Sequence, residues 1–110
     1  MGSQKSYVEL VDTPICMEPL RRKIENPDAG AHGWFVGVTR RTTGQRVTET
    51  LHYEAPNAMA RRELNKLAER AVQEFSLLHV VIVHRLGEVP IAEASVAVGR
   101  SSRHRLETFA

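Results

Sequence analysis

The longest regular pattern of apolar and polar positions follows Asn57. From Ala60 to Phe75 apolar residues recur at spacings of three and four, and charged residues such as Arg61 occupy the positions between them. This repeat is typical of a helix with one buried face and one solvated face. Asn is a residue type that caps helix N-termini, so we predict a helix from Asn57 to about Phe75.

Shorter apolar or alternating runs predict strands on both sides of this helix. The five runs are Tyr7–Val11, Trp34–Val38, Val47–Glu54, His79–His84 and Ala94–Gly99. Trp34–Val38 and His79–His84 are apolar enough to indicate strands buried on both faces. Turn-forming residues at Thr42–Gln45 predict a hairpin that joins Trp34–Val38 to Val47–Glu54, and Gly87–Pro90 predicts a second turn.

Two shorter helices complete the predicted order. Met17, Leu20 and Ile24 recur at helical spacing, and a last helix opens at Ser102 and is cut short where the chain ends at Ala110. The order is β-α-β-β-α-β-β-α, which indicates an α+β fold. We expect one domain over residues 7–110, incomplete at its C-terminus, and a disordered start or tag remnant at residues 1–6.

Composition limits the classes of function. The net charge is only +2 with signs interspersed, which argues against a nucleic-acid partner, and no run approaches the roughly 20 apolar residues of a membrane span. The single Cys16 excludes an internal disulfide and a multi-cysteine metal site, and we interpret it as an inert thiol. With no apolar leader at the start, these features predict a cytoplasmic protein.

The segment Ser101–Arg105 places Arg103, His104 and Arg105 where the last helix begins. A helix N-terminus carries partial positive charge and favours anions, so clustered cations there conflict with local propensity. If Ser101 or Ser102 capped the free amides, the cluster would form a phosphate or carboxylate site. The alternative is a set of solvated side chains whose stems cover apolar surface.

Other candidate residues favour structural interpretations. His52 and His84 lie on separate predicted strands and could share a metal, but neither has a third ligand at a known spacing, so we predict no metal site. Trp34 and Phe35 are interpreted as core residues rather than as a platform for stacking a ring.

Four motifs carry a resemblance over nearly all of residues 7–110. They are FVGVTR at Phe35–Arg40, HYEA at His52–Ala55, VIVHRLGEVPIAEASVAV at Val81–Val98 and SSRHR at Ser101–Arg105. In this order the chain resembles the catalytic, large subunit of molybdopterin synthase, the MoaE family. The resemblance implies an α/β hammerhead-like domain that forms a homodimer and binds a small ubiquitin-like sulfur carrier subunit at each end, as a heterotetramer.

The resemblance also implies a sulfurtransferase. The carrier's C-terminal thiocarboxylate delivers sulfur to cyclic pyranopterin monophosphate, which yields the dithiolene of molybdopterin without a bound cofactor or metal. Val38, Thr39, Arg40, His104 and Arg105 fall on the family's substrate-pocket positions. Arg40 and Arg105 would bind phosphate oxygens, and His104 would donate or accept a proton. We therefore expect Arg40, His104 and Arg105 to form one cationic pocket.

One departure from the family pattern bears on activity. Members of the family continue to a segment with two catalytic lysines, whereas the lysines of this chain are Lys5, Lys23 and Lys66, at unrelated positions. The expectation is that the chain as written transfers sulfur slowly at best. Two classes of function stay open, namely the sulfur-transferring subunit and a truncated or degenerate relative that only binds the ubiquitin-like partner.

Overall fold

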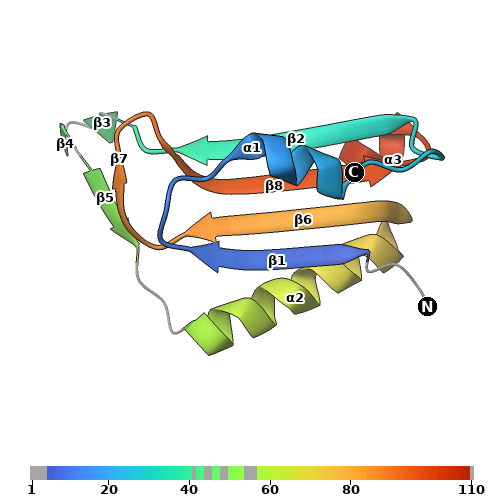
Figure 1. Ribbon diagram of the computed structural model, residues 1–110, viewed down its shortest axis with the longest axis horizontal. Coiled ribbons are helices and arrows are strands. Elements are labelled where there is room, and N and C mark those ends of the chain that lie inside the picture. The colour runs from blue at the N-terminus through green and yellow to red at the C-terminus, as the bar shows by residue number, and fades with distance from the viewer. Residues whose placement is uncertain (1–4, 41, 44–45, 48–49, 54–56, 110) are drawn as a thin grey trace.

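The computed structural model describes residues 5–40, 42–43, 46–47, 50–53 and 57–109. Its centre is a four-stranded sheet in the order β1-β6-β8-β2 (Figure 1). The strands are β1 (Ser6–Val11), β6 (Leu77–Arg85), β8 (Ala94–Ser102) and β2 (Ala31–Val38). β1 runs parallel to β6, and the β6/β8 and β8/β2 pairs are antiparallel. Adjacent strands of this sheet come from distant parts of the sequence, so their pairing joins the two ends of the chain in one domain.

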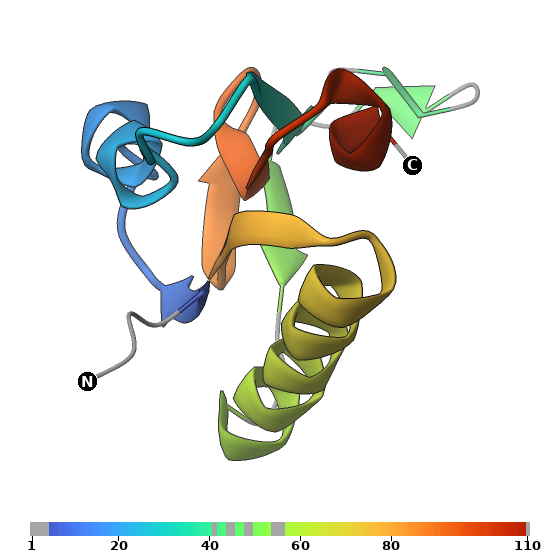
Figure 2. The ribbon, with the colours of Figure 1, turned by 90° about the vertical axis from the view of Figure 1, so that its right-hand side faces the viewer.

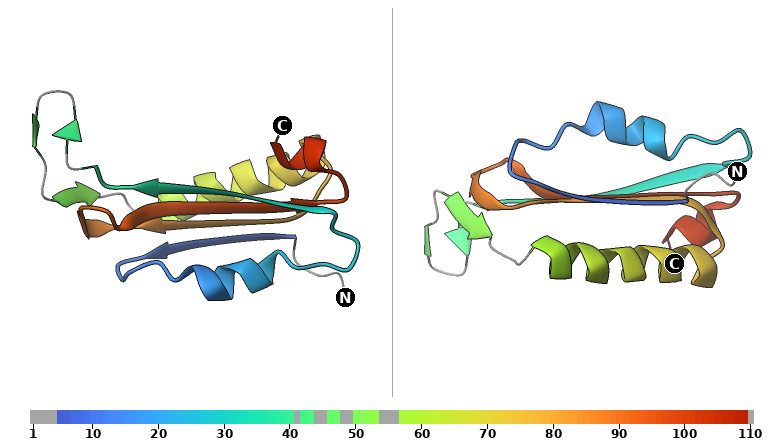
Figure 3. Two further views of the ribbon diagram at one scale, coloured as in Figure 1. Left: turned by 90° about the horizontal axis from the view of Figure 1, so that it is seen from above. Right: turned by 60° about the horizontal axis from the view of Figure 1, so that its bottom comes forward.

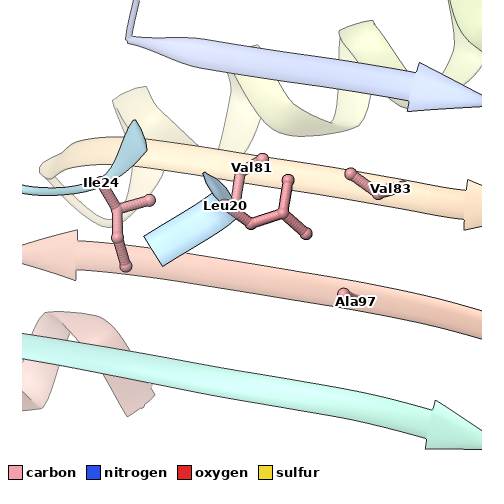
Figure 4. Packing of buried hydrophobic residues seen from close by; sticks show 5 residues of the cluster. All are labelled: Leu20, Ile24, Val81, Val83 and Ala97. Carbon is pink, nitrogen blue, oxygen red and sulfur yellow. The ribbon is translucent and has the colours of Figure 1, made fainter. Parts of the chain in front are cut away.

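Helices cover both faces of this sheet (Figures 2 and 3). α1 (Met17–Lys23) lies on one face, and α2 (Asn57–Glu74) and α3 (Arg105–Phe109) lie on the other. Under α1, buried residues of the helix segment and the two central strands form one core (Figure 4): Leu20, Ile24, Val81, Val83 and Ala97. Under α2 the second core contains Val8, Ala68, Leu77 and Val80. The central run of β6, Val80–Val83, is apolar because successive residues point to opposite faces of the sheet, and helices cover both faces.

These features confirm the predicted mixed α/β single domain and its two longer helical patterns. α2 ends at Glu74, one residue before the predicted end, and α1 contains Met17 and Leu20. β1 begins at Ser6, inside the segment expected to be a disordered start, of which residues 1–4 lie outside the described part. No helix within the described ranges is long and apolar enough to cross a membrane.

The predicted hairpin between Trp34–Val38 and Val47–Glu54 is wrong. β2 pairs with β8, while β5 (Thr50–Tyr53) pairs with β7 (Gly87–Pro90), the segment predicted as a turn. Thr42 and Thr43 form β3, which pairs with β4 (Arg46–Val47). Turn-forming residue types indicate where the chain reverses, but they do not determine which strand pairs with which. Here the pairing with distant strands is more favourable than the local hairpin.

β2 is also more exposed than its sequence predicts. It is an edge strand of the described sheet, and Phe35, Val36 and Val38 are 64%, 40% and 49% exposed. The expectation of a strand buried on both faces, with Phe35 in the core, is therefore wrong. Trp34 does pack against the core under α1, as expected. Its ring lies over Gly99 of β8, where a Cβ would come within 2.3 Å of the ring carbons.

Acid is expected to destabilise the fold through His84 of β6. Burial lowers the pKa of this imidazole below its usual value of about 6.5. Below that pH the unfolded chain takes up a proton that folded His84 resists, so stability present at neutral pH is lost as pH falls through the folded pKa. Urea unfolding at several pH values should show this decrease, with a smaller slope for His84→Gln. An equal slope in both proteins would refute the assignment to His84.

Candidate functional site

The first candidate segment, Val38–Arg40, lies at the C-terminal end of β2. Val38 is the last strand residue, Thr39 is 1% exposed and Arg40 is exposed. The Thr39 N–H donates to the Glu93 carbonyl at 3.2 Å, and the Ala92 N–H donates to the Thr39 carbonyl at 2.9 Å. Hydrogen bonds therefore hold both the N–H and the carbonyl of Thr39, the residue directly before Arg40.

A shift in strand register produces this arrangement. The β2/β8 ladder slips between Gly37 and Val38, so that Gly37 faces Val96 and Val38 faces Ala94. The Ser95 hydroxyl, from the extra residue of β8, donates to the Gly37 carbonyl at 3.3 Å. Such bulges bend a strand and redirect the residues beyond it, here Thr39 and Arg40.

The second candidate segment, Ser101–Arg105, follows the other end of the same strand pair. Ser101 and Ser102 are fully buried residues of β8, whereas Arg103, His104 and Arg105 are exposed. The Ser102 hydroxyl donates to the His104 carbonyl, and it also contacts the Thr108 hydroxyl. These contacts hold the cationic residues at the surface.

The turn before β2 also supports this segment. The Gly30 N–H donates to the Ser102 carbonyl at 2.9 Å. A Cβ on Gly30 would lie 2.3 Å from the Arg103 carbonyl oxygen, so only glycine allows the two backbones to approach this closely. The turn residues Asn26–Gly30 were predicted correctly, and Asn26 closes them by accepting the Asp28 N–H at 2.8 Å.

The predicted start of the last helix at Ser102, with Ser101 or Ser102 as its cap, is wrong. Ser101 and Ser102 belong to β8, and α3 begins only at Arg105 and spans five residues. Ser102 donates to a carbonyl instead of accepting from an amide, and the Ser101 hydroxyl is buried without a hydrogen-bond partner among the described residues. Strand pairing therefore takes up both serines, and neither caps α3 as the sequence predicted.

The two candidate segments do not meet within one chain. In the β2/β8 ladder Val38 faces Ala94, and Ala31 faces Ser102. At about 3.3 Å per residue, the length of β2 separates Arg40 from Arg105 by roughly 25 Å. Figure 1 shows the arrowhead of β2 at one end of the sheet and α3 at the other. A single-chain pocket of Arg40, His104 and Arg105 is thus excluded, while their roles in binding substrate stay predictions.

Two residues near Arg40 were missed by the analysis of the sequence. Arg85, the last residue of β6, is 8% exposed and forms an ion pair with Glu93, with Nη1 and Oε1 2.7 Å apart. Both line a hollow of about 310 Å³ with Pro14, Ile15 and Ala94. The signal was available, since a charged residue inside the run Val81–Val98 needs a partner if it is buried.

The remaining candidates have no shared site. His52 lies on β5 and His84 on β6, and within the described ranges no group of three or more His, Cys, Asp or Glu residues could hold a metal. Cys16 is exposed, at the start of α1.

The described chain is a mixed α/β domain in which Arg40 follows one end of the exposed edge strand β2 and Arg105 lies near its other end. Its fold is similar to that of the solved molybdopterin synthase from Staphylococcus aureus, with a TM-score of 0.86 and 32% identity over 92% of this chain and 74% of that one. A family model described as MoaE protein matches residues 10–110. The chain belongs to the MoaE family.

Curated relatives share a considerable part of the sequence. The molybdopterin synthase catalytic subunit of Aspergillus niger is 40% identical over 91% of this chain, and that of Drosophila melanogaster is 39% identical over 94%. The chain spans 56% of the length of the first and 28% of the second. The similarity therefore covers most of this chain but only part of each relative.

Proposed function

We propose that this chain is the catalytic subunit of a molybdopterin synthase, which transfers sulfur from a thiocarboxylated carrier to cyclic pyranopterin monophosphate. The observation that carries the proposal is the placement of Arg40, His104 and Arg105, all exposed and held at the two ends of one strand pair. Membership of the MoaE family supports it, as do relatives named as catalytic subunits of this enzyme.

Val38–Arg40 and Ser101–Arg105 lie at opposite ends of the β2/β8 pair, which suggests a site formed between two copies of this chain. In the described sheet β2 has a neighbour on one side only, and it exposes Phe35, Val36 and Val38. If β2 pairs antiparallel with β2 of a second copy, the end that carries Arg40 lies beside the start of the other β2, next to the other chain's Ser101–Arg105. The partner's segment is then two strands away, at about 10 Å, within reach of arginine side chains.

Such a site suits the charges of the proposed reactants. Arg40 from one copy and Arg105 from the other would bind the phosphate oxygens of the substrate through charge-assisted hydrogen bonds. The thiocarboxylate sulfur would bond to a ring carbon while the oxygen on that carbon leaves as water, and His104 would donate or accept a proton in this step. Hydrolysis of the acyl C–S bond would then leave the sulfur on the substrate and release the carrier as a carboxylate. Val38 and Thr39 would shape the wall that leads to Arg40. No bound cofactor or metal takes part in this scheme.

The proposed assembly is a homodimer that carries a small ubiquitin-like carrier on each copy. We place the reaction in the cytoplasm. The single, exposed Cys16 supports this location, because a chain without a possible internal disulfide suits a reducing compartment.

The direct test combines the chain, extended with the lysine-bearing segment of the family, with a thiocarboxylated carrier and cyclic pyranopterin monophosphate. Formation of molybdopterin is the expected result. Calorimetric binding of the carrier without product would favour the alternative of a binding-only relative. A protein that neither binds the carrier nor forms product would refute both.

The edge-strand dimer gives a separate prediction. Val36→Lys places a charge at the centre of the proposed β2 pairing, so we expect it to convert a dimer into a monomer at micromolar concentration. Sedimentation velocity measures this change. Met59→Lys, at a residue of α2 that is 62% exposed, is the matched control and should leave the dimer intact. A wild-type protein that sediments only as a monomer would contradict the edge-strand dimer.

A further inference from the structure

Arg85 and Glu93 form an ion pair in which the arginine side chain is largely buried. The side chain of Arg85 is 10% exposed, that of Glu93 is 47% exposed, and Nη1 lies 2.7 Å from Oε1. Two other pairs, Arg21–Glu18 and Lys66–Glu63, are 3.8 and 3.9 Å long and mostly solvated. Among the described residues Arg85 Nε is buried without a hydrogen-bond partner, so the bond to Glu93 is the interaction that compensates for burying this guanidinium.

The pair is linked to the candidate site through the backbone of Glu93. This residue closes the turn between β7 and β8, where its N–H donates to the Pro90 carbonyl at 3.1 Å and Ala92 has a φ of 70°. The same turn donates to and accepts from the backbone of Thr39. Thr39 is fully enclosed and directly precedes Arg40. A displacement of Glu93 is therefore passed to Arg40 through two hydrogen bonds.

We propose that Arg85 and Glu93 are positioning residues for Arg40. The ion pair holds the turn at Pro90–Glu93 in place, and the hydrogen bonds of the turn hold the backbone of Thr39. The position of the Thr39 backbone then determines the position of the Arg40 Cα, from which the guanidinium extends. This role rests on the proposed function of Arg40 as a phosphate ligand. Recognition of an anion depends on the placement of its ligand to within a fraction of an ångström, so loosening the turn should weaken binding.

A charge-neutral double variant, Arg85→Met with Glu93→Gln, tests the role without leaving a buried charge unpaired. Hydrogen exchange of the Thr39 and Ala92 amides, followed by NMR, reports on the turn itself. We expect exchange at both amides to rise about tenfold, and the affinity for inorganic phosphate to fall about tenfold, in a protein that still folds.

Two further variants complete the design. Arg85→Lys keeps a cation that can pair with Glu93 and should retain most of the phosphate affinity. Glu63→Gln, in the solvated pair with Lys66, is the control and should change neither measurement.

The outcomes separate this inference from the proposed function. Unchanged exchange at Thr39 and Ala92 in the folded double variant would overturn it. Faster exchange together with wild-type affinity for phosphate would also overturn it. The ion pair would then stabilise the turn without affecting how Arg40 binds phosphate. A wild-type protein that binds phosphate no better than Arg40→Ala would instead refute the proposed role of Arg40, and the positioning role with it, whatever the exchange rates.

Discussion

Mixing an Arg40→Ala variant with an Arg105→Ala variant is expected to restore sulfur transfer that each variant alone has largely lost. Each substitution removes a charge-assisted bond to the substrate's phosphate, and such bonds contribute about 1.5 to 3 kcal/mol. In a dimer whose sites combine Arg40 of one copy with Arg105 of the other, a hybrid dimer keeps one site with both arginines intact. The second site of the hybrid carries both substitutions.

The recovery has a defined size. After random reassociation half of the dimers are hybrids, so we expect about a quarter of the wild-type number of active sites. Both variants are made in the chain extended with the lysine-bearing segment of the family, and the measurement is the initial rate of molybdopterin formation after the two have been unfolded and refolded together.

Two controls accompany this experiment. Arg40→Ala refolded with an Arg40→Ala/Arg105→Ala protein should show no recovery, since no intact site can form. Arg61→Ala, on the solvated face of α2, should behave as wild type. Absence of recovery in the first mixture, despite hybrid dimers detected by mass, would rule out the shared site.

The largest expected effect on stability comes from Gly99→Val. A Cβ at this position would lie 2.3, 2.4 and 2.7 Å from three carbons of the Trp34 ring. Gly99 is buried in β8 between β6 and β2, so the backbone has little freedom to move away. Overpacking of this kind costs about 3 kcal/mol, and the valine adds two more methyl groups to the clash.

Urea unfolding should show this loss as a lower midpoint with an unchanged slope. Trp34→Ala combined with Gly99→Val should be more stable than the sum of the single changes predicts, because the smaller side chain makes room for the valine. Gly87→Asn is the control. No atom lies within 4 Å of a Cβ there, so its cost comes only from the positive φ of 83°, which asparagine tolerates better than most residues, and should be about 1 kcal/mol. Wild-type stability for Gly99→Val would show that β2 and β8 do not approach as described.

Local sequence determined the elements with strong internal patterns. The apolar repeat after Asn57 specified α2 because helical spacing is a property of neighbouring residues. Apolar runs specified β6 and β8, and the residues at Asn26–Gly30 specified a turn. The motifs also pointed to the MoaE family, which the family model confirms. None of these predictions required knowledge of which elements become neighbours.

Strand pairing was decided only in three dimensions. Val47–Glu54 alternates as a strand should, yet its Thr50–Tyr53 part pairs with Gly87–Pro90, more than thirty positions away. An apolar strand reads the same whether it is central or at an edge, so the exposure of β2 could not be read from Trp34–Val38. Likewise, Ser101 and Ser102 resembled a helix cap in the sequence. In the structure they are the last residues of β8, where they pair with β2 and β6.

The candidate site shows the same division. The sequence proposed Arg40, His104 and Arg105 as candidates for one site, because residue type and motif are local properties, and their shared function stays a prediction. Antiparallel register then placed them at opposite ends of β2 and β8, and a buried ion pair, Arg85–Glu93, joined a strand end to a turn beside Arg40. Register and burial arise from contacts between segments far apart in the chain. For that reason the candidate residues could be chosen from the sequence, while their arrangement in space depended on the fold.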